Sequence, residues 1–280
     1  MNDSRRERLP LTFHSSFQPE ACYLTALLQD AERVGEGTVE EISARTRIPT
    51  GKSTGKVEPL IKYAQGMGLI NVKVLHGTRK RSLSLTSLGR VVLSNDPAVR
   101  EENTQWALHL MLCRRGGGAD AWYSVFVNAG NLLGRRFSMD KLQDFLLNRY
   151  GSSRDAIGPL LRSYKENSLF GRAPAIVQEG EDLLLRRVPT KLALYDTVGA
   201  LLFMVWDAEM AGDAQIALTE LEVKSGLISA TGWSLEEQSQ FLAALEGEGH
   251  LRVDRQTGAP ILTRLATTEQ ILRVMYDRLV

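Results

Sequence analysis

The sequence predicts a mainly α fold built from three winged-helix-like units in tandem, each a helix-turn-helix followed by a β-hairpin. The first observation is an internal repeat with the pattern of a helix, a short turn and a second helix. The pattern occurs in three segments: Thr38–Ile70, Ser138–Phe170 and Leu218–Leu251. The second is that two short β-like runs, separated by turn residues, follow each of these segments. Helix, turn, helix and hairpin make up the winged-helix unit, and a repeat of this length determines the fold prediction before local detail does.

The first unit opens with a helix expected over residues 19–34, where apolar residues recur at helical spacing. Thr38 with Glu41 three residues later is a capping box for the next helix. The second helix of the pair is expected over residues 56–67, with Ser53 and Thr54 as candidate N-caps. We expect it to bury Val57, Leu60, Ile61 and Ala64 and to leave outward Lys56, Lys62 and either Tyr63 or Gln65.

The remaining elements follow from the same signals. Helices are expected over 104–114, 122–133, 138–150, 154–167, 193–210 and 267–279, the fifth of them long and apolar. The expected hairpins pair 71–75 with 81–85, 175–178 with 182–188, and 252–254 with 261–265. Asn95-Asp96-Pro97 and Pro189 mark boundaries, which divide the chain into domains 1–97, 98–190 and 191–280.

Composition excludes several classes of protein. The two cysteines, Cys22 and Cys113, lie far apart in a chain of 280 residues, which argues against a disulfide framework or a zinc knuckle. The N-terminus has no apolar core typical of a signal peptide, and the longest apolar run, Val198–Trp206, is about half the length of a membrane span. We therefore expect a cytoplasmic protein with no membrane partner.

Charge is distributed unevenly, although the net charge is only +1. Residues 45–90 hold ten basic side chains and a single acid, Glu58, whereas residues 207–264 hold ten acids and four basic side chains. One end of the chain therefore suits a polyanion, and the other end would repel it.

The basic first unit predicts a site for duplex DNA. Winged-helix domains place the second helix of the pair in the major groove and the hairpin against the backbone or the minor groove. We expect the DNA-binding residues at the start of that helix, along it and at the hairpin: Lys52, Ser53, Thr54, Lys56, Lys62, Arg79, Lys80 and Arg81. The alternative is a solvated basic face on a unit that binds protein.

Signals for catalysis are weak. Gly51-Lys52-Ser53-Thr54 looks like the end of a phosphate-binding P-loop, but the glycine required five residues earlier is Thr46. The histidines are isolated from one another, and His109 is expected to be a hydrogen-bonded core residue. We also expect Trp106, Trp122, Tyr123 and Phe126 to be core residues rather than a base-stacking platform. The sequence predicts no catalytic residues, no metal and no cofactor.

Several stretches of residues 13–190 together form a recognisable pattern. These stretches are Phe13-His14-Ser15-Ser16-Phe17 with Tyr23-Leu24, Gly66-Met67-Gly68-Leu69-Ile70, Leu85-Thr86-Ser87-Leu88-Gly89, Asp96-Pro97 with Glu102-Asn103-Thr104-Gln105-Trp106-Ala107-Leu108-His109, Ala121-Trp122-Tyr123 with Phe126 and Asn128, and Arg154-Asp155 with Tyr164. The pattern resembles a bacterial family catalogued as domain of unknown function four-zero-zero-seven. The family is similar to helix-rich proteins of DNA phosphorothioation and phage-defence operons, found beside phosphoadenosine-phosphosulfate-reductase-like genes. It tends to carry an arginine before a Trp-Leu pair, where this chain has Pro19-Glu20 and Tyr23.

The resemblance implies a DNA-acting accessory protein of a modification or defence complex. We therefore expect a non-catalytic DNA-binding subunit whose protein partner is a phosphoadenosine-phosphosulfate-reductase-like subunit. The acidic third unit is the expected protein-docking surface. The alternatives are a stand-alone winged-helix transcriptional regulator and a protein-interaction scaffold.

Overall fold

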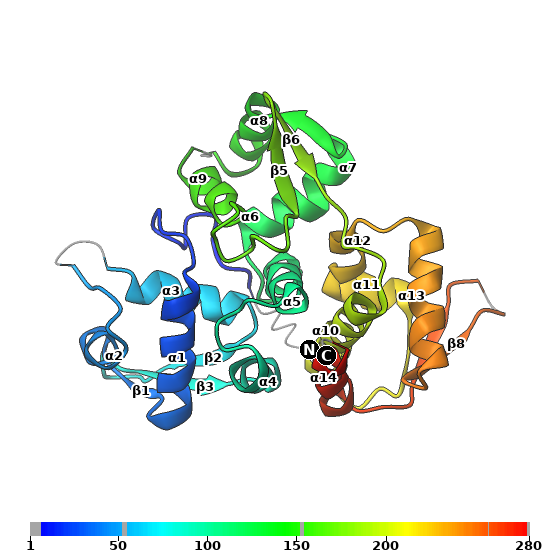
Figure 1. The fold of residues 1–280 in the computed structure, drawn as a ribbon, viewed down its shortest axis with the longest axis horizontal. Helices are drawn as coiled ribbons and strands as arrows, with labels where there is room; N and C mark the ends of the chain where they lie inside the picture. Colours follow the sequence, from blue (N-terminus) through cyan, green and yellow to red (C-terminus); the bar gives the residue numbers. More distant parts are fainter. Residues whose placement is uncertain (1–6, 52–54, 152–153, 257, 279–280) are drawn as a thin grey trace.

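The computed structural model describes residues 7–51, 55–151, 154–256 and 258–278. These residues form a mainly helical protein with three small antiparallel sheets, each of three strands. One order of elements recurs three times along the described chain: a helix, a short strand, two or three helices and a β-hairpin. Figure 1 shows the three repeats as three lobes around a central helix.

The first repeat has its sheet in the order β1-β3-β2, so that the edge strand before the helix pair lies beside the last strand of the hairpin. Its elements are α1 (Ala21–Arg33), β1 (Glu36–Gly37), α2 (Val39–Thr46), α3 (Val57–Gly66), β2 (Ile70–Val74) and β3 (Arg81–Leu85). Helices α4 (Ser87–Asn95) and α5 (Glu102–Cys113) then lead out of the repeat.

The second repeat begins with a continuous helical segment whose middle is a π-helix, where an α-helix was expected throughout. The segment consists of α6 (Asp120–Trp122), the π-helix η1 (Tyr123–Ala129) and α7 (Gly130–Leu132). It is followed by β4 (Arg136–Ser138), α8 (Met139–Tyr150), α9 (Arg154–Arg162), β5 (Ile176–Glu179) and β6 (Asp182–Leu185), and the sheet order is β4-β6-β5.

The third repeat begins with the long apolar helix that the sequence predicts, and its sheet has the order β7-β9-β8. Its elements are α10 (Leu192–Glu209), β7 (Gln215–Ala217), α11 (Leu218–Ser225), α12 (Leu227–Thr231), α13 (Leu235–Gly247), β8 (Leu251–Asp254), β9 (Ile261–Arg264) and α14 (Thr268–Asp277). None of the helices in the described residues combines the length and the apolar character that crossing a bilayer requires.

Local signals in the first repeat are partly confirmed. The capping box is present, because the Glu41 amide donates to Thr38 Oγ1 and the Thr38 amide donates to Glu41 Oε2. The N-cap position of α3 is Lys56, whose side chain forms no cap hydrogen bond. The predicted caps, Ser53 and Thr54, lie outside the described residues. Tyr63 does not point outward: it is fully buried and donates its hydroxyl hydrogen to the Phe17 carbonyl.

The edge strand β1 depends on a glycine. Gly35 has a φ of +67°, and a Cβ at this position would lie 2.5 Å from the carbonyl oxygen of Leu83. Only a glycine allows both this backbone conformation and so close an approach. The approach brings Glu36 and Gly37 into register with Ser82 and Arg81 on β3.

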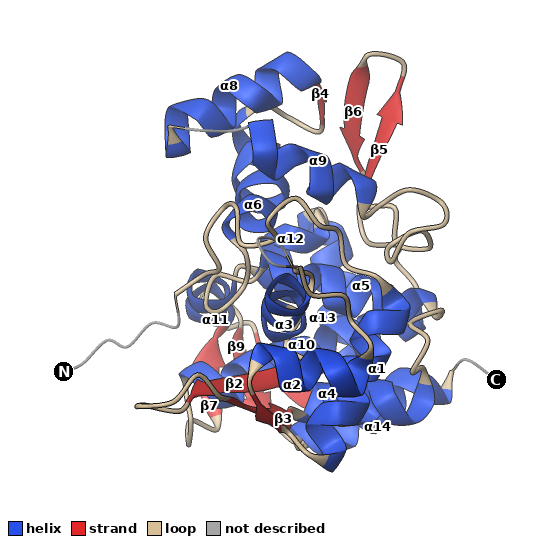
Figure 2. Cartoon of the chain, turned by 90° about the vertical axis from the view of Figure 1, so that its left-hand side faces the viewer, coloured by secondary structure: helices blue, strands red, loops and turns tan. Residues whose placement is uncertain are grey.

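Helix α5 lies in the middle of the molecule and is buried along nearly its whole length. Every residue from Asn103 to Cys113 is buried. It packs against α10 and α12 of the third repeat and against η1 of the second. Figure 2 shows the β5–β6 hairpin at one end of the molecule and the other two sheets at the opposite end, with α5 between them.

The polar residues of α5 are hydrogen-bonded to surrounding segments, as burial requires. Asn103 Nδ2 donates to the Met275 carbonyl at 2.6 Å, and Thr104 Oγ1 lies 2.7 Å from Tyr276 Oη. Met275 and Tyr276 both belong to α14. Gln105 accepts from the Arg172 amide at 2.7 Å and thereby ties the helix to the segment before β5.

His109 is the hydrogen-bonded core residue that the sequence predicts. Its Nδ1 lies 2.6 Å from Tyr164 Oη, which accepts a hydrogen bond from Trp122 Nε1 at 2.8 Å. The tautomer of the imidazole decides which of the two groups, the Tyr164 hydroxyl or His109 Nδ1, donates this hydrogen bond. Burial lowers the pKa of His109 to about 3. Trp106, Trp122, Tyr123 and Phe126 are also buried, which confirms that they belong to the core.

The buried imidazole predicts a pH-dependent loss of stability. Below about pH 6.5 the unfolded state binds a proton at His109 and the folded state does not. The contribution of the buried neutral imidazole to the free energy of unfolding is therefore complete only above that pH. As the pH falls from about 6.5 toward 3, the free energy of unfolding should decrease by up to about 1.4 kcal/mol per pH unit from this residue. Urea unfolding of the wild type and of His109→Gln between pH 7 and 4 measures the difference. Parallel pH profiles for the two proteins would contradict the assignment.

Candidate nucleic-acid interface

The candidate DNA-binding residues lie on one helix and one hairpin of the first repeat. Lys56 and Lys62 lie on α3 or at its start, Arg79 and Lys80 lie in the turn between β2 and β3, and Arg81 begins β3. Lys52, Ser53 and Thr54, together with most of the sequence that looks like a P-loop, lie outside the described residues. The fold therefore brings helix and hairpin residues into one repeat, as the sequence predicts.

Lys56 is held by the N-terminal part of the repeat. Its Nζ donates to Glu20 Oε1 at 2.6 Å and lies 5.2 Å from the centre of the Tyr23 ring. The hydrogen bond from Lys56 to Glu20 raises the pKa of Lys56. Lys56 is thus a fixed, partly neutralised cation, and a DNA phosphate at this position would compete with Glu20.

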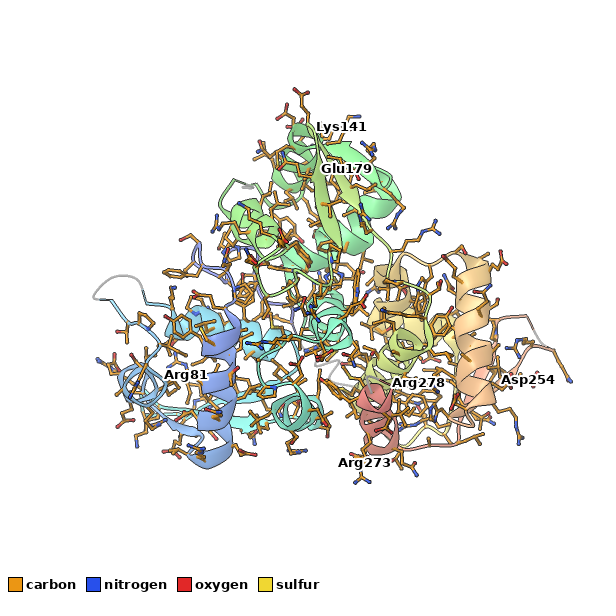
Figure 3. All side chains as sticks on the ribbon, viewed as in Figure 1. Arg81, Lys141, Glu179, Asp254, Arg273 and Arg278 are labelled. Carbon is orange, nitrogen blue, oxygen red and sulfur yellow. The ribbon has the colours of Figure 1, made fainter. Side chains whose placement is uncertain are left out.

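The hairpin cations differ from one another. Arg81, which is labelled in Figure 3, forms an ion pair with Glu58 on α3, and 24% of its side chain is exposed. Lys80 Nζ lies 3.5 Å from Glu36 Oε1. Arg79 is exposed and forms no ion pair with any residue that the structure describes. Arg79 is therefore the hairpin cation that is most accessible to a phosphate.

Carboxylates from a neighbouring stretch of sequence surround the basic segment. Of the nine basic side chains of this segment that the structure describes, four are in ion pairs: Arg45 with Asp30, Lys56 with Glu20, Lys80 with Glu36 and Arg81 with Glu58. Three of these acids precede residue 45, so a charge count over residues 45–90 misses them. Sequence reasoning predicted which side chains are basic but overestimated their free charge.

Other exposed cations extend the candidate interface beyond the predicted residues. Arg47, Lys73 and Arg90 are exposed, and none forms an ion pair with the described residues. The ten-to-one excess of basic residues in this segment was the signal that could have identified them. Together with Arg79 and the half-buried Lys62, they are the cations that remain available to a polyanion.

The third repeat carries the exposed acids Glu220 and Glu236 and the half-buried acids Glu222 and Glu237. Glu236 and Glu237 lie in the first turn of α13, beside Leu235, of which 82% is exposed. Glu220 and Glu222 lie on α11, where 59% of Val223 is exposed. Within the described residues, no group of three or more His, Cys, Asp or Glu side chains could hold a metal ion.

Comparisons with known proteins reveal a shared fold. No protein-family model matches the chain, and no curated protein matches it. A crystal structure of SspB matches 98% of this chain and 89% of that chain, with a TM-score of 0.70 and 15% identity. A magnesium ion-bound SspB crystal structure matches 96% of this chain and 87% of that chain, with a TM-score of 0.69 and 15% identity.

At this identity the likeness shows the fold alone. It nevertheless extends over nearly the whole chain, so all three repeats share the arrangement of those structures. SspB is a protein of a phosphorothioation system.

Proposed function

We propose that this protein is a non-catalytic DNA-binding accessory subunit of a phosphorothioation-type DNA modification or phage-defence system. The observation that carries the proposal is the fold likeness to SspB over 96% to 98% of the chain. The sequence resemblance to proteins of such operons points in the same direction and rests on different observations.

The order of elements supports a winged-helix assignment for each repeat. A helix, a strand, a helix pair and a hairpin, with the first strand paired to the last, is the arrangement expected of a winged-helix unit. In the first repeat, α3 would enter the major groove and the β2–β3 hairpin would contact the backbone. Arg79 at the hairpin turn and Lys62 on α3 would then meet phosphates.

The third repeat would dock the protein partner. Its acids repel a duplex within the Debye length of about 8 Å at physiological salt. The exposed Leu235 and Val223 beside these acids provide apolar contacts that a protein partner can bury. In line with the operon resemblance, we propose a phosphoadenosine-phosphosulfate-reductase-like subunit as this partner.

The proposal predicts that Arg79 contributes more to DNA binding than Arg81 does. Removing one cation that neutralises a phosphate lowers the slope of log affinity against log salt by about 0.9. Arg79→Ala should therefore reduce this slope by about 0.9, because its cation is free to contact a phosphate. Arg81→Ala should change it by less than half as much, since Glu58 already neutralises Arg81. Fluorescence anisotropy with a labelled 30-base-pair duplex (about three helical turns), at several salt concentrations, measures both slopes.

Arg273→Ala is the matched control. Arg273 is an exposed arginine on α14 and lies at the outer edge of the molecule, as Figure 3 shows. Arg273→Ala removes one positive charge, as Arg79→Ala does, and should leave the slope of log affinity against log salt unchanged. If Arg79→Ala behaves like this control, the hairpin is not part of a DNA interface, and the scaffold alternative, which the internal ion pairs favour, takes its place.

The non-catalytic part of the proposal has its own test. Supercoiled plasmid incubated with the full chain and magnesium should remain supercoiled, because the described residues offer no group of metal-holding side chains. Agarose electrophoresis separates the supercoiled, nicked and linear forms. The appearance of nicked or linear plasmid that chelation of magnesium abolishes would overturn this part of the proposal.

A further inference from the structure

A cleft of about 910 Å³ lies where the second and third repeats meet the N-terminal segment. We call it the π-helix cleft and define it by Arg8, Arg115, Tyr123, Asn128, Arg149 and Lys224. Its volume is within the range of about 300–1,000 Å³ that is typical of small-molecule sites. None of these residues belongs to the candidate DNA interface.

The walls of the cleft are tied together by the backbone. The Leu9 amide donates to the Gly118 carbonyl at 2.8 Å, and the Asp120 amide donates to the Leu9 carbonyl at 2.9 Å. On the other side, the Arg115 amide donates to the Ser225 carbonyl at the end of α11, at 2.7 Å. The cleft is therefore formed by fixed segments.

The π-helix η1 presents two of the lining side chains together. Tyr123 and Asn128 are five residues apart, and both line the cleft. The i→i+5 hydrogen bonding of a π-helix brings residues at this spacing to nearly the same face, whereas an α-helix separates them. Single π-helical turns are frequent at functional sites, because they reposition side chains in this way.

Hydrogen-bond donors predominate among these side chains. Arg115 donates through Nε and Nη2 to Tyr123 Oη, at 3.2 Å and 3.0 Å. A phenol oxygen has two lone pairs and one hydrogen, so the Tyr123 hydroxyl hydrogen remains to be donated. Asn128 Nδ2 is buried and meets no acceptor among the residues that the structure describes. An acceptor-rich ligand would satisfy both groups.

Cations complete the donor set. Arg8 is paired with Asp120 at 2.7 Å, but neither Arg115 nor Arg149 has a carboxylate partner among the described residues. Glu7 and Glu209 also line the cleft and can accept hydrogen bonds from hydroxyl groups. Guanidinium groups without a carboxylate partner suit a phosphate, and carboxylates suit the hydroxyls of a sugar.

We propose that the π-helix cleft binds a nucleotide, with its phosphate on Arg115, Asn128 and Arg149. The phosphate accepts hydrogen bonds from the guanidinium groups and from the otherwise unsatisfied Asn128 amide. The nucleotide is either free or the 5′-phosphorylated end of a nucleic-acid strand, since both present the same chemistry.

The test uses the full chain and three probes: inorganic phosphate, an equimolar mixture of the four ribonucleoside monophosphates, and a 5′-phosphorylated trinucleotide. Isothermal titration calorimetry should show saturable binding of the mixture or of the trinucleotide, and whichever binds more tightly identifies the source. Asn128→Asp replaces a donor by a negative acceptor of the same size. We expect it to weaken binding by about tenfold or more, which corresponds to 1.4 kcal/mol.

Arg149→Gln should also weaken binding, whereas the charge-matched control Arg273→Gln should not. Arg149 is exposed, so this variant is expected to fold even if Asn128→Asp does not. The proposal is wrong if no probe binds saturably at about 1 mM, if inorganic phosphate binds as tightly as the nucleotides, or if Arg149→Gln behaves like its control. Arg79→Ala should leave nucleotide affinity unchanged, so failure here and failure of the proposed DNA interface are distinguishable.

Discussion

The burial of α5 is the constraint on which the rest of the structure depends. A helix whose residues are buried on every side depends on partners inside the protein for its polar groups, because an unsatisfied buried group costs about 1–3 kcal/mol. Asn103 and Thr104 do so through α14, and Gln105 and His109 do so through segments of the second repeat. The same helix thus holds elements of the second and third repeats in one arrangement, and these two repeats cannot be separated without exposing it.

Sequence reasoning predicted the three hairpins and many of the helices, because their signals are local, but it missed α4 and placed the end of α9 five residues too late. The capping box at Thr38 and the apolar pattern of α3 each lie within a few residues of the element they specify. The strands β1, β4 and β7 were missed, since runs of two or three residues become strands only through pairing with a distant hairpin. The π-helix was also missed, because the sequence of η1 has no feature that separates it from an ordinary buried helix.

The sequence predicted which residues make up the candidate DNA interface, but not which of their charges are neutralised by ion pairs. The residue types and their places on helix and hairpin followed from the repeat. Their partners did not, because Lys56 and Arg45 pair with acids 36 and 15 residues away in sequence. The π-helix cleft could not be predicted from the sequence for a similar reason. Its lining comes from the N-terminal segment, η1, α8 and α11, which only the fold brings together.

The ion pairs of the first repeat have a consequence for how the protein would meet a chromosome. Glu20, Glu36 and Glu58 act as built-in counterions for Lys56, Lys80 and Arg81. A duplex that displaces them would release fewer dissolved ions than the number of lysines and arginines suggests, and the entropy gained from that release would be correspondingly smaller. A protein built in this way would dwell only briefly on bulk DNA, and long residence at one place would require a second attachment, through a partner already bound there.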